Sequence, residues 1–162
     1  MTQSDSPFPR RRAPLPVEEC GAALASRLLS DRWTLLIVRE GFYGVTRFDD
    51  MRADLGIPRS VLADRLDKLV EAGVFARQPY REEGARTRQA YVLTRAGWKL
   101  SLTVLALMQW GDEHLRGGKS SLDVTEKGTG KPLRVALVRD GDDFVRLSQV
   151  DYMPRNTGET GK

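Results

Sequence analysis

The fold is decided by residues 47–69, which read RFDDMRADLGIPRSVLADRLDKL. The first half of this stretch repeats apolar side chains at helical spacing, at Phe48, Met51 and Leu55. The second half repeats leucines at the same kind of spacing, at Leu62, Leu66 and Leu69. Between the halves, Gly56 favours the end of one helix, and Pro58 favours the first turn of the next, where the N–H that proline lacks has no partner. Two short helices joined by so tight a turn predict a helix–turn–helix.

Two more helices are expected before this stretch. Between residues 17 and 30 the apolar side chains fall on one helical face, and a second helix is expected from residue 32 to about residue 42. Asp31 stands directly before that second helix, where its carboxylate can accept hydrogen bonds from the first free backbone N–H groups. The sequence therefore predicts that Asp31 caps the second helix.

A β-hairpin and a long helix are expected after the stretch. Residues 74–80 and 89–93 are strand-like, and the polar segment REEGARTR lies between them. Thr94 is placed to cap a helix that runs from residue 95 to about residue 115. A hairpin that follows a helix–turn–helix is a wing, so the predicted fold class is mainly α with a small β wing, a winged helix-turn-helix.

Composition and charge limit the classes of function that are possible. The chain has 162 residues, of which 40% are apolar and 30% charged, and this excludes a wholly disordered protein. It contains neither a membrane-spanning apolar run nor a signal peptide, so we expect a soluble cytoplasmic protein. The formal charge is +4, and residues 58–100 hold nine basic and five acidic side chains. This concentration permits a nucleic-acid partner, although charge alone favours the interpretation as a solvated surface.

Several segments together resemble the HxlR family of bacterial winged-helix regulators, relatives of the MarR group. The matching segments are LLSDRWTLLI (28–37), RFDDM (47–51), SVLADRL (60–66) with Leu69 and Gly73, and YVLT (91–94) followed by Gly97. The resemblance covers about residues 18–116. It implies a dimeric DNA-binding repressor or activator without enzymatic activity.

With this resemblance, the chain divides into three parts. Residues 1–16 are rich in proline and arginine and are expected to form a disordered basic arm. Residues 17–116 are expected to form the domain for DNA binding and dimerisation. Residues 117–162 form an extension, in which strands at 133–138 and 144–150 flank Asp140-Gly141 and predict a second hairpin over 133–150.

The second helix of the helix–turn–helix is expected to lie in the major groove of DNA. Opposite its leucines it presents Arg59, Ser60 and Asp64, which we expect to read bases, and Lys68, which we expect to contact the backbone. Asp64 has two interpretations that stand about even. Its carboxylate can accept a hydrogen bond from a cytosine amino group, or it can pair with Lys68 four residues later.

The wing carries Arg81, Arg86 and Arg88 around a central glycine. Arginines on a hairpin can enter a narrow minor groove, where the negative potential is enhanced. The alternative is a solvated loop, in which Glu82 and Glu83 neutralise part of the charge. With the fold taken into account, we expect the three arginines to contact DNA.

Cys20 is the one cysteine, which excludes a disulfide within the chain and a thiolate metal cluster. It stands near the start of the first helix, where backbone N–H groups favour a thiolate, although Glu18 and Glu19 oppose it. The resemblance implies a sensor of oxidants, quinones or aldehydes, because several redox-responsive members carry a cysteine near this position. Its products would be a sulfenic acid, a mixed disulfide or a bridge between two subunits. The alternative is a small buried apolar residue.

The remaining residues indicate neither a metal nor a cofactor. His114 is the only histidine and is expected to favour a helix C-terminus. The stripe of Trp98, Leu102, Leu105 and Met108 is expected to form a dimer interface together with the first helix.

The function we expect is therefore a homodimeric transcriptional regulator, a repressor, that binds a pseudo-palindromic operator. Its release would follow oxidation at Cys20 or binding of a small-molecule effector. Two rivals stay open: a winged-helix module that binds proteins, and a small-molecule-binding protein whose tail hairpin forms the site.

Overall fold

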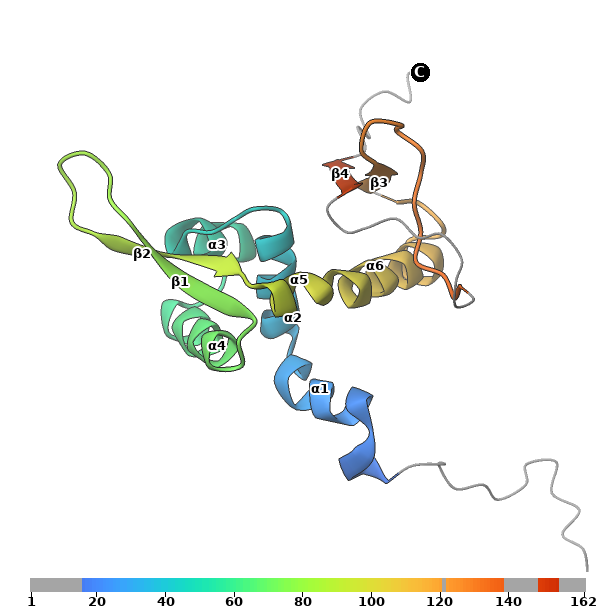
Figure 1. Ribbon diagram of the computed structural model, residues 1–162, viewed down its shortest axis with the longest axis horizontal. Helices are drawn as coiled ribbons and strands as arrows, with labels where there is room; N and C mark the ends of the chain where they lie inside the picture. The colour runs from blue at the N-terminus through green and yellow to red at the C-terminus, as the bar shows by residue number, and fades with distance from the viewer. Residues whose placement is uncertain (1–15, 121, 139–148, 155–162) are drawn as a thin grey trace, which may run out of the picture.

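The computed structural model describes residues 16–120, 122–138 and 149–154 (Figure 1). The predicted basic arm lies outside these residues, apart from Pro16. The helices are α1 (Gly21–Leu29), α2 (Arg32–Phe42), α3 (Phe48–Leu55), α4 (Arg59–Glu71), α5 (Arg95–Lys99) and α6 (Ser101–Leu115). The strands are β1 (Phe75–Tyr80), β2 (Arg88–Leu93), β3 (Leu122–Glu126) and β4 (Val150–Pro154).

The core lies where α2, α3 and α4 meet. The three leucines that predicted α4, Leu62, Leu66 and Leu69, have no exposed surface, and neither has Met51 of α3. Gly56 ends α3 with φ +60°, a left-handed conformation that glycine adopts at no steric cost. The structure thus confirms the helix–turn–helix predicted from residues 47–69.

The wing is an antiparallel pair of strands, with Phe75 opposite Leu93 at its base and Tyr80 opposite Arg88 near its tip. Phe75 is buried in the core, whereas the next four residues of β1 are exposed, so the hairpin projects from the body (Figure 1). Tyr91 donates its backbone N–H to the carbonyl of Thr46, which ties β2 to the segment before α3. The fold is a winged helix, as predicted.

The first helix is shorter than the sequence predicts. Residues Val17–Glu19 form a 3₁₀ turn, Cys20 is extended, and α1 begins at Gly21. None of the residues of α1 is buried, and the helix points away from the core (Figure 1). Of its apolar side chains, Leu28 packs against the core, whereas Leu24 is 49% exposed.

The long helix expected over residues 95–115 is divided at Leu100 into α5 and α6. Thr94 caps α5 as predicted, by accepting a hydrogen bond from the backbone N–H of Gly97. The two pieces pack against different partners, α5 against β2 and α6 against α2, and this accounts for the division. Of the stripe expected at a dimer interface, Leu105 and Met108 line a pocket against α2, whereas Trp98 and Leu102 are 41% and 52% exposed. The dimer interface itself stays a prediction.

The extension contains a strand pair, but not the predicted one. Strands β3 and β4 pair antiparallel, with Leu122 opposite Pro154 and Glu126 opposite Val150. The predicted strand at 133–138 is wrong: these residues form no strand. Val135 instead binds Gln109 of α6 through its backbone. The N–H of Val135 donates to Gln109 Oε1 at 3.1 Å, and Gln109 Nε2 donates to the carbonyl of Val135 at 3.4 Å. Residues 144–148 of the other predicted strand lie outside the described residues.

Among the described residues, no helix combines the length and the apolar composition needed to cross a membrane.

Candidate nucleic-acid interface

The exposed face of α4 carries the four residues that the sequence singles out on it. Arg59, Ser60, Asp64 and Lys68 are all exposed, on the side opposite the buried leucines. Arg59 is the first residue of α4, and its guanidinium lies 5.1 Å from the centre of the Phe48 ring. The helix therefore presents three polar or charged groups over its first two turns, with Lys68 further along.

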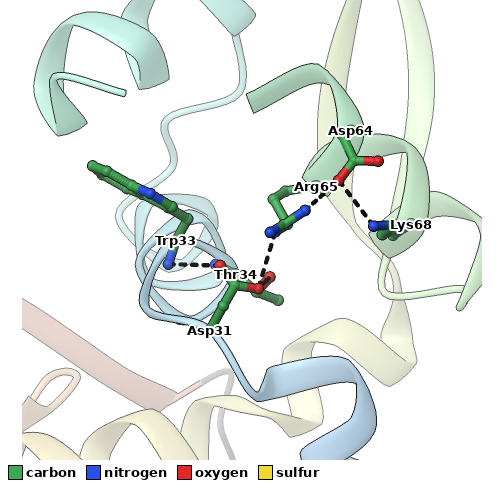
Figure 2. A network of polar contacts seen from close by, with 6 residues as sticks. All are labelled: Asp31, Trp33, Thr34, Asp64, Arg65 and Lys68. Carbon is green, nitrogen blue, oxygen red and sulfur yellow. Dashed lines mark hydrogen bonds and ion pairs between the residues drawn. The ribbon is translucent and has the colours of Figure 1, made fainter. Parts of the chain in front are cut away.

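Asp64 pairs with Lys68 in this structure: Lys68 Nζ lies 2.9 Å from Asp64 Oδ2 (Figure 2). Arg65 donates to the same oxygen through its Nη1. The hydrogen bond from Lys68, together with the charges of Lys68 and Arg65, lowers the pKa of Asp64 below its usual value. The carboxylate thus stays ionised at neutral pH, beside two cations.

Arg65 also connects α4 to the start of α2. Its Nε lies 3.0 Å from Asp31 Oδ2 (Figure 2). The capping role predicted for Asp31 is confirmed, since its Oδ1 accepts from the backbone N–H groups of Trp33 and Thr34 at 3.0 and 3.2 Å. Burial alone raises the pKa of Asp31, but the bonds from Thr34 and Arg65 outweigh it and lower the pKa overall.

The wing arginines differ in their surroundings. Arg88 Nη1 lies 3.5 Å from Asp49 Oδ2 of α3, and Arg81 Nε donates to the carbonyl of Ala85 at 2.9 Å. Arg86 is exposed, and no hydrogen bond or ion pair joins it to another of the described residues. Of the three, Arg86 is the one most available to an outside anion.

Asp49 links the wing to α4. Its Oδ1 lies 3.8 Å from Arg59 Nη1, while its Oδ2 faces Arg88. These ion pairs are exposed and contribute little stability, but they hold two arginines from different elements on one surface. The structure thus brings α4 and the wing together at Asp49.

Sequence reasoning missed Arg47. Its Nη1 lies 2.7 Å from Glu82 Oε1, and its guanidinium lies 4.9 Å from the centre of the Tyr80 ring. This pair neutralises one of the two wing carboxylates that favoured the solvated-loop interpretation. Arg47 precedes α3 by one residue and Glu82 follows β1, so only the tertiary arrangement reveals their pairing.

Cys20 caps α1 with its backbone rather than its side chain. It is half-buried and not part of a disulfide, and its thiol accepts no hydrogen bond from the first turn of the helix. This position is compatible with both interpretations of the thiol, the sensor and the packing residue.

A small pocket lies between α2 and α6, lined by aromatic and apolar side chains of Phe42, Tyr43 and Met108. Ser101 also lines it, and its buried hydroxyl is left without a hydrogen-bond partner among the described residues. In the same described part of the chain, no three His, Cys, Asp or Glu side chains gather in a way that could hold a metal ion.

Comparison with known proteins agrees with this fold. The model of a family described as HxlR-like helix-turn-helix matches residues 28–119. The uncharacterised HTH-type transcriptional regulator Rv3095 of Mycobacterium tuberculosis is 50% identical over 98 residues. That alignment covers 60% of this chain and only 60% of the relative's length.

Two solved structures extend the comparison. The crystal structure of PA1607, proposed to be a transcription factor, has 34% identity and a TM-score of 0.66, covering 76% of this chain and 85% of that one. The reduced form of the transcriptional regulator YodB from B. subtilis has 26% identity and a TM-score of 0.51. It covers 62% of this chain and 98% of YodB.

Proposed function

The chain belongs to the HxlR-like helix-turn-helix family, and on that premise we propose that it is a transcriptional regulator that binds double-stranded DNA. The observation that carries this proposal is the shared surface of α4 and the wing, on which Arg59 and Arg88 flank Asp49. Such a surface can contact both grooves of one duplex at once.

In the proposed complex, α4 lies in the major groove, where the N-terminal residues of a recognition helix contact base edges. Arg59 and Ser60 occupy that end of α4. An arginine there can bind a guanine through two hydrogen bonds. Lys68 reaches the phosphate backbone, and Arg81, Arg86 and Arg88 of the wing enter the adjacent minor groove, with Arg86 the most accessible.

We also propose a homodimer built from α1 and α6. On α6, Leu107 and Trp110 are 49% and 55% exposed and lie three residues apart on one side of the helix. Leu102 of α6 is 52% exposed, and Leu24 on α1 is 49% exposed. Apolar side chains gathered on two helices in this way mark an interaction surface. A two-fold dimer would place two α4 helices on a pseudo-palindromic operator with half-sites about one DNA turn apart.

The direct test is binding to the DNA upstream of the protein's own gene, measured over a range of salt concentrations. We expect tight binding that weakens steeply with salt, because each neutralised phosphate releases about one counterion. A protein that binds no duplex, even weakly at low salt, would contradict the proposal and favour a winged-helix module for protein partners.

Removing two wing arginines should reduce the salt dependence. For Arg86→Ala/Arg88→Ala we expect weaker binding and a slope of log K against log salt that is shallower by about 2. The matched control is Arg95→Ala/Lys99→Ala, which removes two exposed charges from α5, at the base of the wing rather than near its tip. An unchanged slope in the wing variant, or an equal change in the control, would refute groove contact by the wing.

We propose that the regulator is a repressor released by oxidation or an electrophile at Cys20. The half-buried thiol at the start of α1 supports this, because α1 belongs to the proposed dimer interface. A thiol modified there would change how the two subunits, and hence the two α4 helices, are spaced. The similarity to YodB, whose reduced form has been solved, supports a redox trigger.

Cys20→Ser separates this trigger from a small ligand. We expect wild-type protein to release its operator after mild oxidant, and Cys20→Ser to stay bound with unchanged affinity in the reduced state. The measurement is operator binding before and after oxidant, with reversal by a thiol reductant. If oxidant still releases the Cys20→Ser variant from its operator, the thiol is not the trigger. A small ligand bound in the pocket between α2 and α6 would then be the favoured trigger.

A further inference from the structure

We propose that Arg65, anchored on Asp31, is a positioning residue that presents one oxygen of Asp64 to a cytosine in the major groove. This inference rests on the proposed function, and it assigns a role in sequence specificity to two residues that do not themselves face the DNA. The contacts that carry it form one chain from α2 to the exposed face of α4 (Figure 2).

Asp31 is a rigid anchor. Its Oδ1 is held by two backbone N–H groups of α2, and its Oδ2 accepts from Thr34 Oγ1 at 2.6 Å and from Arg65 Nε at 3.0 Å. Thr34 is itself buried in the core. With four donors on two oxygens, the carboxylate has little freedom to move.

Because Arg65 binds this anchor, its guanidinium is held in a fixed position beside Asp64. The guanidinium is planar, so a nitrogen held at Asp31 fixes where its other nitrogens lie. Its Nη1 binds Asp64 Oδ2, and Lys68 Nζ binds that same oxygen from the other side, at 2.9 Å. Arg65 is only 26% exposed, whereas Asp64 is 48% exposed.

Both cations thus use one oxygen of Asp64. The other, Oδ1, receives no hydrogen bond from the part of the chain that the structure describes, and Figure 2 draws no contact to it. An exposed carboxylate oxygen is an acceptor only. In the major groove the base-edge donors are the amino groups of cytosine and adenine, and a carboxylate pairs with that of cytosine.

The same arrangement resolves the two interpretations of Asp64 that the sequence leaves open. A carboxylate near phosphates is repelled, but Arg65 and Lys68 offset its charge while leaving Oδ1 free. Pairing with Lys68 and accepting from cytosine are therefore compatible, because they use different oxygens.

The experiment measures base preference at every position of the operator, by competition among duplexes that each carry one substituted base pair. We expect Asp64→Asn to change the preference at one base pair from cytosine to adenine, since an amide pairs with adenine. This variant identifies the position that Asp64 reads. The wild type sets the reference.

Two variants then test the positioning role. Asp31→Asn keeps a good helix cap but replaces the oxygen that holds Arg65 with an amide nitrogen, and Arg65→Gln removes the link itself. For both we expect the cytosine preference at the position identified by Asp64→Asn to fall at least about five-fold, with preferences elsewhere and binding to random duplex little changed. The control is Asp67→Asn, which breaks the 2.6 Å pair between α4 and Arg77 of β1 and should leave all preferences unchanged.

The outcomes separate the inference from the proposed function. If wild-type protein shows no salt-dependent binding to any duplex, the proposed function fails. If it binds but Asp31→Asn and Arg65→Gln keep the cytosine preference, or lose preference equally at all positions, the positioning role fails while the regulator stands.

Discussion

A Gly97→Ala variant is expected to unfold at a much lower temperature than the wild type, with a loss of about 3 kcal/mol in the free energy of unfolding. A Cβ at residue 97 would lie 2.2 Å from the carbonyl oxygen of Val74 and 2.9 Å from Leu93 Cδ2. The carbonyl cannot retreat easily, because it accepts a hydrogen bond from the backbone N–H of Thr94 at 3.0 Å. Either α5 must move away from the base of the wing or the wing must shift.

Thermal unfolding followed by circular dichroism measures this effect, and we expect a fall in Tm of roughly 10 °C. The matched control is Gly111→Ala in α6, where a Cβ would meet nothing within 4 Å. That change should be neutral or stabilising by up to about 1 kcal/mol, because alanine favours a helix over glycine. Equal Tm values for Gly97→Ala and wild type would show that the approach of α5 to Val74 is looser than described.

The second large effect is expected from Leu107→Glu, which should convert the proposed dimer to a monomer and weaken operator binding by about a hundred-fold, because the two half-sites would no longer be bound together. Leu107 is 49% exposed on the same side of α6 as Trp110, three residues later. A glutamate there should leave the fold of the single chain intact, because the side chain already meets solvent in it. In a dimer interface the same glutamate would be a buried charge without a partner.

Sedimentation velocity and operator binding test this prediction together. The control is Leu137→Glu, which places the same charge on a fully exposed leucine of the extension, and which should remain dimeric and bind DNA as the wild type does. A Leu107→Glu variant that still sediments as a dimer would move the interface away from this face of α6. Loss of the dimer in the Leu137→Glu control would place the extension in the interface instead.

On α4, the sequence predicted which side is buried but not every contact that the helix makes. The spacing of its leucines predicted which side of the helix is buried, and with it the exposure of Ser60, Asp64 and Lys68. The same reasoning named Asp31 as a cap but missed its bond to Arg65, 34 residues later. Helical periodicity reports which face of a helix is apolar, and it carries no information on which distant side chain that face will meet.

In the extension, by contrast, the sequence predicted an element that the structure does not contain. Residues 133–138 of the extension are rich in valine and leucine, and they predicted a strand that the structure does not contain. Strand propensity depends on a neighbouring strand to pair with, and β3 pairs instead with β4 on one side and with residues 132 and 133 on the other. On that second side the pairing ends at Leu133, and Val135 binds Gln109 of α6 instead.

Short-range patterns in the sequence were enough to predict the elements that local chemistry controls. These are the turn at Gly56 and Pro58, the caps at Asp31 and Thr94, the buried leucines of α4 and the presence of a wing. Tertiary packing was needed to set where the helix after the wing divides, which cation neutralises Glu82, and that one carboxylate joins Arg59 to Arg88. The physical reason is range: caps and periodicity act within a few residues, whereas these ion pairs join side chains that the packing of the core brings together.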